Sequence, residues 1–440
     1  VEIMSQLLPL SLGQRLLWAL DRLRGESGAL NCPSMCHVEG TIELGQLQNA
    51  LNELVAMHSA LRTTIVPGRS VRQQINSLSS PVSIRFEDLD RKDRDVLKNE
   101  FIKKELSTRI DPTVSPIRVS LLKLGTTSFL LIINVHHIVT DLISSHILIE
   151  DLAEILNRKI KLNSSSQNME APKVSWDNEA FCNWQLEQIQ VEGFSRQQRY
   201  WFERLAGMSP IASPLKAERL DRNGSTGLIE VSIDKNVRAR LDEIAQKTQS
   251  SSFVVLLAVL YSMAFEQAGE KDFSVASLFS SRTRPELRRT VGFLVNLLVL
   301  RIRLSDKPNF MDVVEQSRRA VLEGLNNADL PFQSLSPPPP RIKVRDNARI
   351  DDVVFHVVPN PIETVYGSES LRLNAIVPEV IGRFDLEIAI RPTQDEYIVR
   401  LSFNSSRLDE NSAKKFVNDY VETAHRVANQ PDKSMEHVYG

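Results

Sequence analysis

The sequence predicts an α/β protein with two mixed sheets, because helices and strands alternate in both halves of the chain. Apolar, β-branched runs of strand length recur throughout, and the clearest of them covers residues 129–135. Segments with apolar residues at helical spacing separate these runs, as in residues 10–23. A polar tract between residues 157 and 174 divides the chain into halves long enough for separate cores. We therefore expect two domains, residues 1–171 and 172–440.

The first half contains the simplest patterns. Helical spacing predicts helices over 10–23 and 47–61, and apolar runs predict strands over 36–42, 82–86, 117–124 and 129–135. The tract at 163–168, Asn-Ser-Ser-Ser-Gln-Asn, is typical of a linker.

The second half repeats the alternation. We expect helices over 179–205 and 237–267, and strands over 227–233, 273–280, 297–304, 352–359, 381–391 and 397–403. The proline tract at 335–341 predicts a rigid extended spacer, with a ligand for a polyproline-binding module as the alternative.

The overall composition argues against several classes of protein. With 53 basic and 55 acidic residues the net charge is −2, so no general field favours nucleic acid or an anionic membrane. No apolar stretch reaches the roughly 18–20 residues that span a bilayer. The first residues lack signal-peptide features, and the start at Val1 suggests processing or a domain of a longer chain. Three scattered cysteines favour reduced thiols and a cytoplasmic location over a disulfide framework.

The most informative segment is the end of the strand at 129–135. It stops at His136 and His137, Asp141 follows four residues later, and helical spacing begins at Leu142. Histidine is the side chain best suited to exchange protons near neutral pH, and a nearby carboxylate can fix a tautomer or the backbone. The alternative is a polar strand end that faces solvent.

Other segments extend this pattern in order along the chain. His136-His137-x-x-x-Asp141-Leu142 matches a signature His-His-x-x-x-Asp-Gly except at the last position. The further segments are Ser11–Trp18, Met57–Thr63, Ala180–Gln185 with Tyr200-Trp201, Ser281–Leu287, Val291–Leu297, Asn327–Gln333 and, more loosely, Arg345–Phe355. Together they resemble the condensation domain of a nonribosomal peptide synthetase or of a hybrid polyketide synthase–peptide synthetase.

The resemblance implies a fold and an activity. The fold would be two lobes, each like chloramphenicol acetyltransferase, forming a V-shaped pseudo-dimer with a central substrate tunnel. The activity would be acyl transfer from a carrier-protein thioester to an amine or hydroxyl acceptor. The implied partners are donor and acceptor carrier proteins, or a small-molecule acceptor, and neighbouring megasynthase domains. No cofactor or metal bound by the domain itself is expected, because the substrates are carried on the phosphopantetheine of the carrier proteins.

The resemblance also assigns roles to residues. His137 would be catalytic, either removing a proton from the acceptor or stabilising the developing ammonium, with His136 packed behind it. Asp141 would be structural and paired with Arg282, or failing that with Arg62. Asn296 would be a supporting donor facing the tunnel, with a loop or strand-end cap as the alternative.

Departures from the family pattern keep other functions open. Leu142 stands where the family has glycine, close to the expected path of the substrate arm, and we expect it to line the tunnel. Leu16 and Asn327 replace a usual arginine and histidine. The chain could therefore be an active condensation domain, a domain that releases or cyclises a chain, or a catalytically silent docking module for carrier proteins.

Overall fold

The computed structural model describes most of the chain. The described residues are 7–25, 28–40, 43–77, 81–89, 93–162, 176–208, 210–211, 214–215, 226–335, 350–358, 365–368, 371–376 and 384–436. Contacts divide the chain into two compact units. The first comprises Val1–Gly193, Ser280–Val295 and Pro361–Ile381, and the second comprises Phe194–Phe279, Asn296–Asn360 and Gly382–Gly440. The division in space is therefore not a single cut in the sequence, and the expected boundary at residues 171 and 172 lies outside the described residues.

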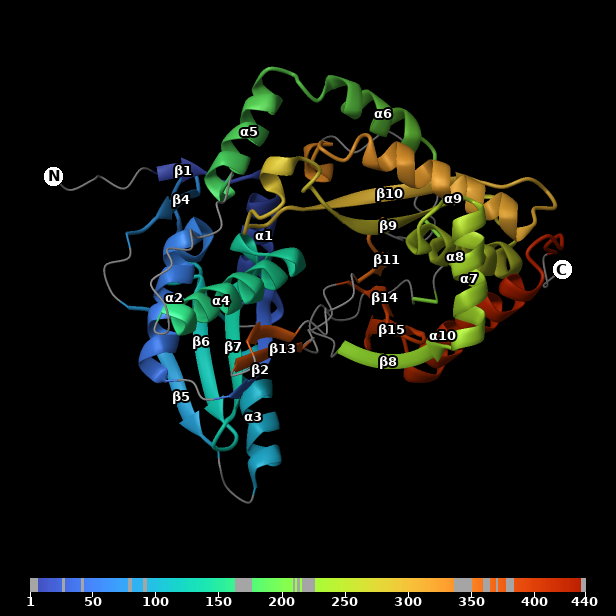
Figure 1. The fold of residues 1–440 in the computed structure, drawn as a ribbon. Helices are drawn as coiled ribbons and strands as arrows, with labels where there is room; N and C mark the ends of the chain where they lie inside the picture. The colour runs from blue at the N-terminus through green and yellow to red at the C-terminus, as the bar shows by residue number, and fades with distance from the viewer. Residues whose placement is uncertain are drawn as a thin grey trace. The chain divides into compact units, whose positions relative to one another are not determined.

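The first unit is built on a six-stranded mixed sheet (Figure 1). Its strands, in spatial order, are β12 (Val365–Ser368), β13 (Leu371–Ile376), β2 (Asn31–Gly40), β7 (Ser128–His136), β6 (Ile117–Lys123) and β5 (Ile84–Asp88). Strands β5 and β6 are parallel, whereas β13, β2, β7 and β6 pair antiparallel. Strand β7 lies inside the sheet and is almost entirely buried, which explains its continuous apolar sequence.

Helices cover both faces of this sheet. The helices of this unit are α1 (Leu12–Arg24), α2 (Leu44–Met57), α3 (Arg94–Ser107), α4 (Leu142–Leu162) and α5 (Asn178–Gln190), of which α5 packs against β1 and not on this sheet. Helices α2 and α4 contribute to the main core together with the odd-numbered positions of β7, while α3 packs against the even-numbered ones. A small sheet of β1 (Leu7–Pro9), β4 (Arg72–Ile75) and β3 (Thr63–Val66) completes the unit.

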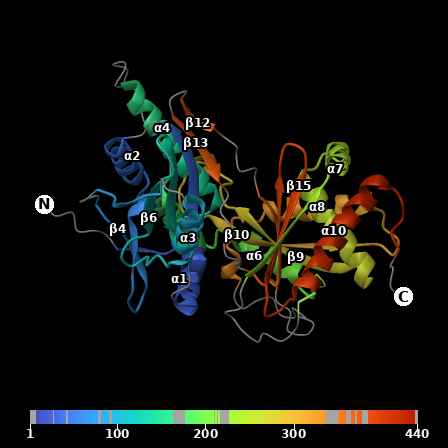
Figure 2. The same cartoon turned by 90° about the horizontal axis from the view of Figure 1, so that it is seen from below.

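The second unit has its own six-stranded mixed sheet. The spatial order is β10 (Val295–Arg303), β9 (Asp272–Ser280), β11 (Val353–Val357), β14 (Leu386–Pro392), β15 (Tyr397–Asn404) and β8 (Thr226–Ile233). Its helices are α6 (Ser195–Leu205), α7 (Lys235–Lys247), α8 (Ser252–Ala268), α9 (Phe310–Leu325) and α10 (Glu410–Asn429). Figure 2 shows α7, α8 and α10 gathered beside β15. The prediction of an α/β chain with two mixed sheets is thus confirmed.

Two predicted helices are wrong in their length, because each is broken by a turn. The helix expected over 179–205 is α5 followed by α6, with Glu192 at a φ of 53° and the Gly193 amide donating to Gln188 O at 2.8 Å. The helix expected over 237–267 is α7 followed by α8, with Gln249 at a φ of 49°. Ser251 then caps α8 by accepting a hydrogen bond from Val254 N. Apolar spacing runs through both breaks, so it did not reveal them.

Helix α3 was not predicted because its apolar pattern is weak, whereas α9 and α10 were not predicted although each has a well-defined buried face. Helix α3 buries only Phe101 and Glu105, so helical spacing hardly marks it. Helix α8 shows the opposite pattern, since nearly every residue in it is buried. Among the described residues, no single helix has the length and hydropathy to cross a membrane; α7 and α8 reach that threshold only as a pair, bent by 110°.

Candidate functional site

The histidine pair lies where β7 ends inside the core of the first unit. His136 is the last residue of β7, residues His137–Val139 form a single 3₁₀ turn, and α4 begins at Leu142. Gln14 of α1 reaches this turn, because its Nε2 donates to Ile138 O at 3.1 Å and to Gln73 Oε1 at 3.2 Å. A buried side chain from another helix therefore holds the backbone beside both imidazoles.

His137 is buried, and 8% of its surface remains exposed to solvent. Its Nδ1 lies 2.8 Å from Thr140 O, and a carbonyl can only accept, so Nδ1 carries the proton. In the neutral ring, Nε2 is then the basic nitrogen. The ring also makes an edge contact with Phe293, with centroids 5.0 Å apart and planes at 83°. The backbone thus fixes the tautomer of His137, a role that the sequence suggested for a carboxylate.

His136 has the opposite tautomer. Its Nδ1 accepts a hydrogen bond from Ile138 N at 3.1 Å, which leaves Nε2 to donate to Asp21 Oδ1 at 3.3 Å. Asp21 also accepts from Arg109, at 2.6 Å from Nη2. Burial raises the pKa of Asp21, but the hydrogen bonds from His136 and Arg109 outweigh it and hold the pKa below 3.8. His136 is therefore tied into a buried ionic cluster.

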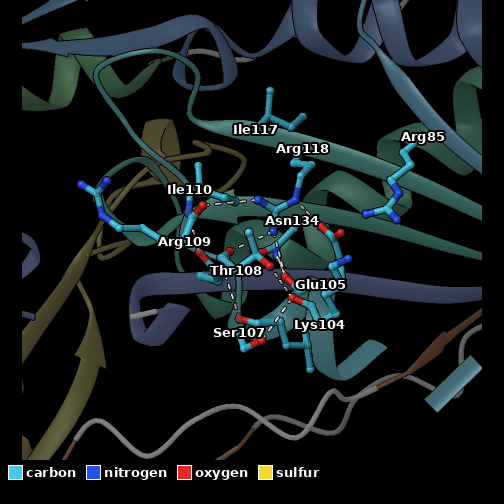
Figure 3. A network of polar contacts seen from close by, with 12 residues as sticks. Arg85, Lys104, Glu105, Ser107, Thr108, Arg109, Ile110, Ile117, Arg118 and Asn134 are labelled. Carbon is cyan, nitrogen blue, oxygen red and sulfur yellow. Dashed lines mark hydrogen bonds and ion pairs between the residues drawn. The ribbon is translucent and has the colours of Figure 1, made fainter. Parts of the chain in front are cut away.

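A second polar network continues from Arg109 along the face of the sheet that α3 covers (Figure 3). Arg118 forms an ion pair with Glu105, and its Nη2 donates to Glu105 O at 2.8 Å and to Thr108 O at 3.0 Å. Asn134, two residues before His136, donates to Glu105 O at 3.1 Å. These bonds satisfy carbonyls at the end of α3 and brace the strand that carries the histidines.

Asp141 is held by donors on both oxygens. Oδ1 accepts from Ser144 N at 2.8 Å, Ser144 Oγ at 2.8 Å and Arg282 Nη2 at 3.0 Å. Oδ2 accepts from Arg282 Nη1 at 2.8 Å and from Leu294 N at 3.1 Å. A carboxylate has about four lone-pair sites, so these bonds use its capacity. Asp141 acts as the N-cap of α4 and as an anchor for the segment around Leu294.

Arg282 is the partner of Asp141, as the motif positions predicted. Its guanidinium also donates to Ser280 Oγ at 3.0 Å, Ser144 Oγ at 2.9 Å and Thr290 O at 2.8 Å. The alternative partner, Arg62, is used elsewhere, since its Nε and Nη1 donate to Val55 O and Asn76 O. The contacts thus confirm the first of the two arginines that the sequence offered.

Asn296 belongs to the second unit, where it clamps a loop. Its Nδ2 donates to Ala328 O at 2.8 Å and to Leu330 O at 2.7 Å, and its Oδ1 accepts from Phe332 N at 3.0 Å. Both amide hydrogens are therefore engaged by backbone carbonyls. This geometry is what the capping alternative for Asn296 predicts.

Leu142 is the first residue of α4 and is 44% exposed. His146 follows one turn later on the same helix face, and burial lowers its pKa despite nearby Glu150 and Asp141. Glu150 in turn accepts a hydrogen bond from Arg289. The partly exposed Leu142 side chain and the partly buried His146 imidazole thus lie on the same face of α4.

The remaining chemistry-bearing groups are structural in their contacts. His58 pairs with Asp151 at 2.8 Å, and both side chains are buried. The three cysteines are buried, and burial raises the pKa of Cys182 to about 11. Within the ranges that the structure describes, no group of three or more His, Cys, Asp or Glu side chains is arranged to hold a metal ion.

Sequence reasoning missed several residues that hold the site. Asp21 and Arg109 carry no signal of their own, because they lie 115 and 88 positions from the partners that explain them. Phe293 stands at a variable position of its motif, so the pattern assigns it no role. The position of Ser144 could have been found, because the backbone N–H three residues after an N-cap aspartate donates to its carboxylate.

Comparison with known proteins identifies the family of this chain. The family model of the condensation domain matches residues 4–439. The chain belongs to the condensation-domain family. It is 25% identical over 443 residues to tyrocidine synthase 2 of Brevibacillus parabrevis, a match that covers 98% of this chain and 12% of that protein. It is 26% identical over 428 residues to the cyclosporin synthetase of Tolypocladium inflatum, covering 97% of this chain and 3% of that protein. The chain thus spans only a small part of these relatives.

Solved structures share the fold. The X-domain from teicoplanin biosynthesis matches with a TM-score of 0.82 at 19% identity, over 99% of this chain and 98% of that one. The condensation domain from the monacolin K polyketide synthase MokA matches with a TM-score of 0.80 at 18% identity, over 98% and 99% of the two chains. The chain therefore has the fold of these domains, as the resemblance implied.

Proposed function

We propose that this condensation domain transfers an acyl group from a carrier-protein thioester to an amine or hydroxyl acceptor. The observation that carries the proposal is the bond from His137 Nδ1 to Thr140 O, which leaves a basic Nε2 on a rigidly held ring. The family matches of peptide synthetases and a polyketide synthase domain support a place in such an assembly line.

In the reaction, the acceptor nitrogen or oxygen attacks the thioester carbonyl and a tetrahedral oxyanion forms. Nε2 of His137 accepts the hydrogen of the acceptor, either as a base or as a hydrogen-bond acceptor that stabilises the developing charge. Collapse breaks the carbon–sulfur bond, and the thiol of the phosphopantetheine arm leaves with the proton. The substrates bring their own prosthetic arm, so the domain needs no cofactor of its own. The tunnel that the resemblance implies and a cytoplasmic setting, where thiols stay reduced, belong to the same proposal.

His136, Asp141 and Arg282 are proposed to position His137. Their support is geometric: His136 is bonded to Asp21, and Asp141 and Arg282 are bonded to each other. Asn296 is proposed to shape the second unit through its loop clamp.

The test is intact-protein mass spectrometry of an acyl-loaded donor carrier protein with this domain and candidate acceptors. We expect loss of the acyl group from the carrier, a condensed product, and abolition of both by His137→Ala. His425→Ala is the matched control, because His425 lies on the surface of α10, where it pairs with Asp234 at 3.3 Å. Hydrolysed or cyclic product would instead identify a releasing or cyclising domain.

A silent docking module is the second candidate, and Leu142 favours it. The exposed leucine occupies the family glycine position directly after Asp141. The teicoplanin X-domain, which has the same fold, has been solved in complex with OxyB. Carrier binding without any transfer, in the wild type as well as in His137→Ala, would support this candidate.

A further inference from the structure

The residues before and after Phe293 are both hydrogen-bonded to the segment that follows the histidines. Gly292 N donates to Ser144 Oγ at 3.1 Å, and the same hydroxyl oxygen lies 3.0 Å from Gly292 O. On the other side, Leu294 N donates to Asp141 Oδ2 at 3.1 Å. The backbone at 292 and 294 is therefore fixed to the first turn of α4, and Phe293 has little freedom to move along the chain.

The ring of Phe293 then lies against the imidazole. It is 9% exposed and makes the edge contact with His137 at 5.0 Å between centroids. The bond from Nδ1 to Thr140 O holds one edge of the imidazole, and the aromatic ring limits its rotation about the Cβ–Cγ bond. Without that neighbour, the imidazole could turn over about this bond. Cδ2 and Cε1 would then occupy the places of Nδ1 and Nε2, and the hydrogen bond to Thr140 O that fixes the tautomer would be lost.

A glycine in α1, Gly13, leaves the space that the Phe293 ring occupies. A Cβ at Gly13 would lie 2.6 Å from Phe293 Cε1 and 2.8 Å from Cδ1, closer than real contacts allow. Gly13 lies in the first turn of α1, directly before Gln14, whose side chain holds Ile138 O. The three atoms nearest to an alanine Cβ at this position would all belong to the Phe293 ring.

We propose that Gly13 and Phe293 form a matched pair that sets the orientation of the His137 imidazole. Phe293 is a positioning residue in this pair, and Gly13 is the position that admits its ring. The inference rests on the proposed function only for its kinetic consequence, since the orientation of the ring is a property of the domain alone.

The test is a double-mutant cycle over Gly13→Ala and Phe293→Leu. Because the Gly13 methyl would displace the Phe293 ring from its contact with His137, we expect Gly13→Ala to lower kcat at least about tenfold with little change in KM, since a misplacement of about 1 Å can cost about a hundredfold. In the Phe293→Leu background the shorter side chain leaves room, so Gly13→Ala should have almost no additional effect. Additive effects in both backgrounds would overturn the pairing.

A second readout needs no substrate. Nitrogen NMR of the histidines should show His137 as the single Nδ1–H tautomer in the wild type at a pH where the ring is neutral. It should show a mixture of tautomers in Phe293→Leu and in Gly13→Ala. Modification of His137 by diethyl pyrocarbonate should become faster in Phe293→Leu. An unchanged tautomer and modification rate in both variants would contradict the inference.

Matched controls separate this effect from general destabilisation. Gly45 also lies in the first turn of a helix, but a Cβ there would meet nothing within 4 Å, so Gly45→Ala should leave every readout unchanged. Phe101 is buried in the separate core beside α3, so Phe101→Leu should lower the melting temperature without altering His137.

If no acyl transfer is detected in the wild type while the NMR coupling is present, the proposed function fails and the pairing stands. If transfer depends on His137 but the coupling is absent, only the pairing fails.

Discussion

Arg282 grips Asp141 with both ends of its guanidinium, at 2.8 Å from Nη1 to Oδ2 and 3.0 Å from Nη2 to Oδ1, although the residues are 141 positions apart. Both side chains are buried. The pair joins the start of α4 to the segment that carries Phe293, because Asp141 also accepts from Leu294 N. Asp141 thus has a structural role close to His137, because it holds two segments of the chain together.

Asp141→Asn should destabilise the protein more than it impairs the chemistry. The substitution leaves the buried Arg282 without its counter-charge, which costs about 3–5 kcal/mol of unfolding free energy. Urea unfolding measures this loss, and the specific activity of the fraction that remains folded should stay within about tenfold of wild type. Asp395→Asn, which removes an exposed ion pair with Lys235, should leave the free energy of unfolding almost unchanged. A fully stable but inactive Asp141→Asn would contradict the structural role.

Asn296→Asp distinguishes a clamp from a tunnel-facing donor. A carboxylate cannot donate to Ala328 O and Leu330 O, so two buried carbonyls lose their donors. We expect a loss of about 2–4 kcal/mol in unfolding free energy, from unsatisfied carbonyls next to a buried carboxylate. Circular dichroism during denaturant unfolding measures it. Wild-type stability with reduced transfer would instead assign Asn296 to the substrate path.

Asp21→Asn should alter the pH dependence of stability. The pKa of Asp21 in the folded protein lies below its ordinary value of 3.8. Its ionised form therefore stabilises the fold at pH values above 3.8, and that stabilisation is lost as the pH falls through the lower, folded-state pKa. The stability difference between wild type and Asp21→Asn should be largest near neutral pH and shrink on acidification.

Unfolding free energies measured by urea denaturation between about pH 7 and pH 3 test this convergence. Asp95→Asn is the control, because Asp95 is 75% exposed beside Lys98. A difference between wild type and Asp21→Asn that stays constant over the range would rule out the ionic cluster as its source.

Leu142→Gly should change substrate handling and leave the fold intact. The side chain is 44% exposed, so its removal costs little core packing, although glycine in the first turn of α4 costs about 0.5–1 kcal/mol. If Leu142 narrows the path of the substrate arm, the glycine variant should show a higher rate or accept bulkier acceptors. Leu142→Ala keeps helix propensity and serves as the matched variant. Unchanged kinetics in both would exclude Leu142 from the substrate path.

The sequence by itself determined the local features of the site. The apolar run of β7, its end at His136 and the helix that starts after Asp141 follow from patterns within a few residues, because strands and helices repeat over short distances. Ordered motifs were sufficient to indicate the family. Turns such as the one at Glu192 were missed, because apolar spacing continued across them.

Only the tertiary structure decided which distant groups meet. The bond between His136 and Asp21, the bond from Leu294 N to Asp141 and the fit of Phe293 into the space at Gly13 depend on how elements pack. The pairing of β13 with β2 likewise joins residues more than 300 positions apart. Such contacts leave no periodic trace in a single sequence, because any buried donor, acceptor or ring could satisfy them until the fold selects one.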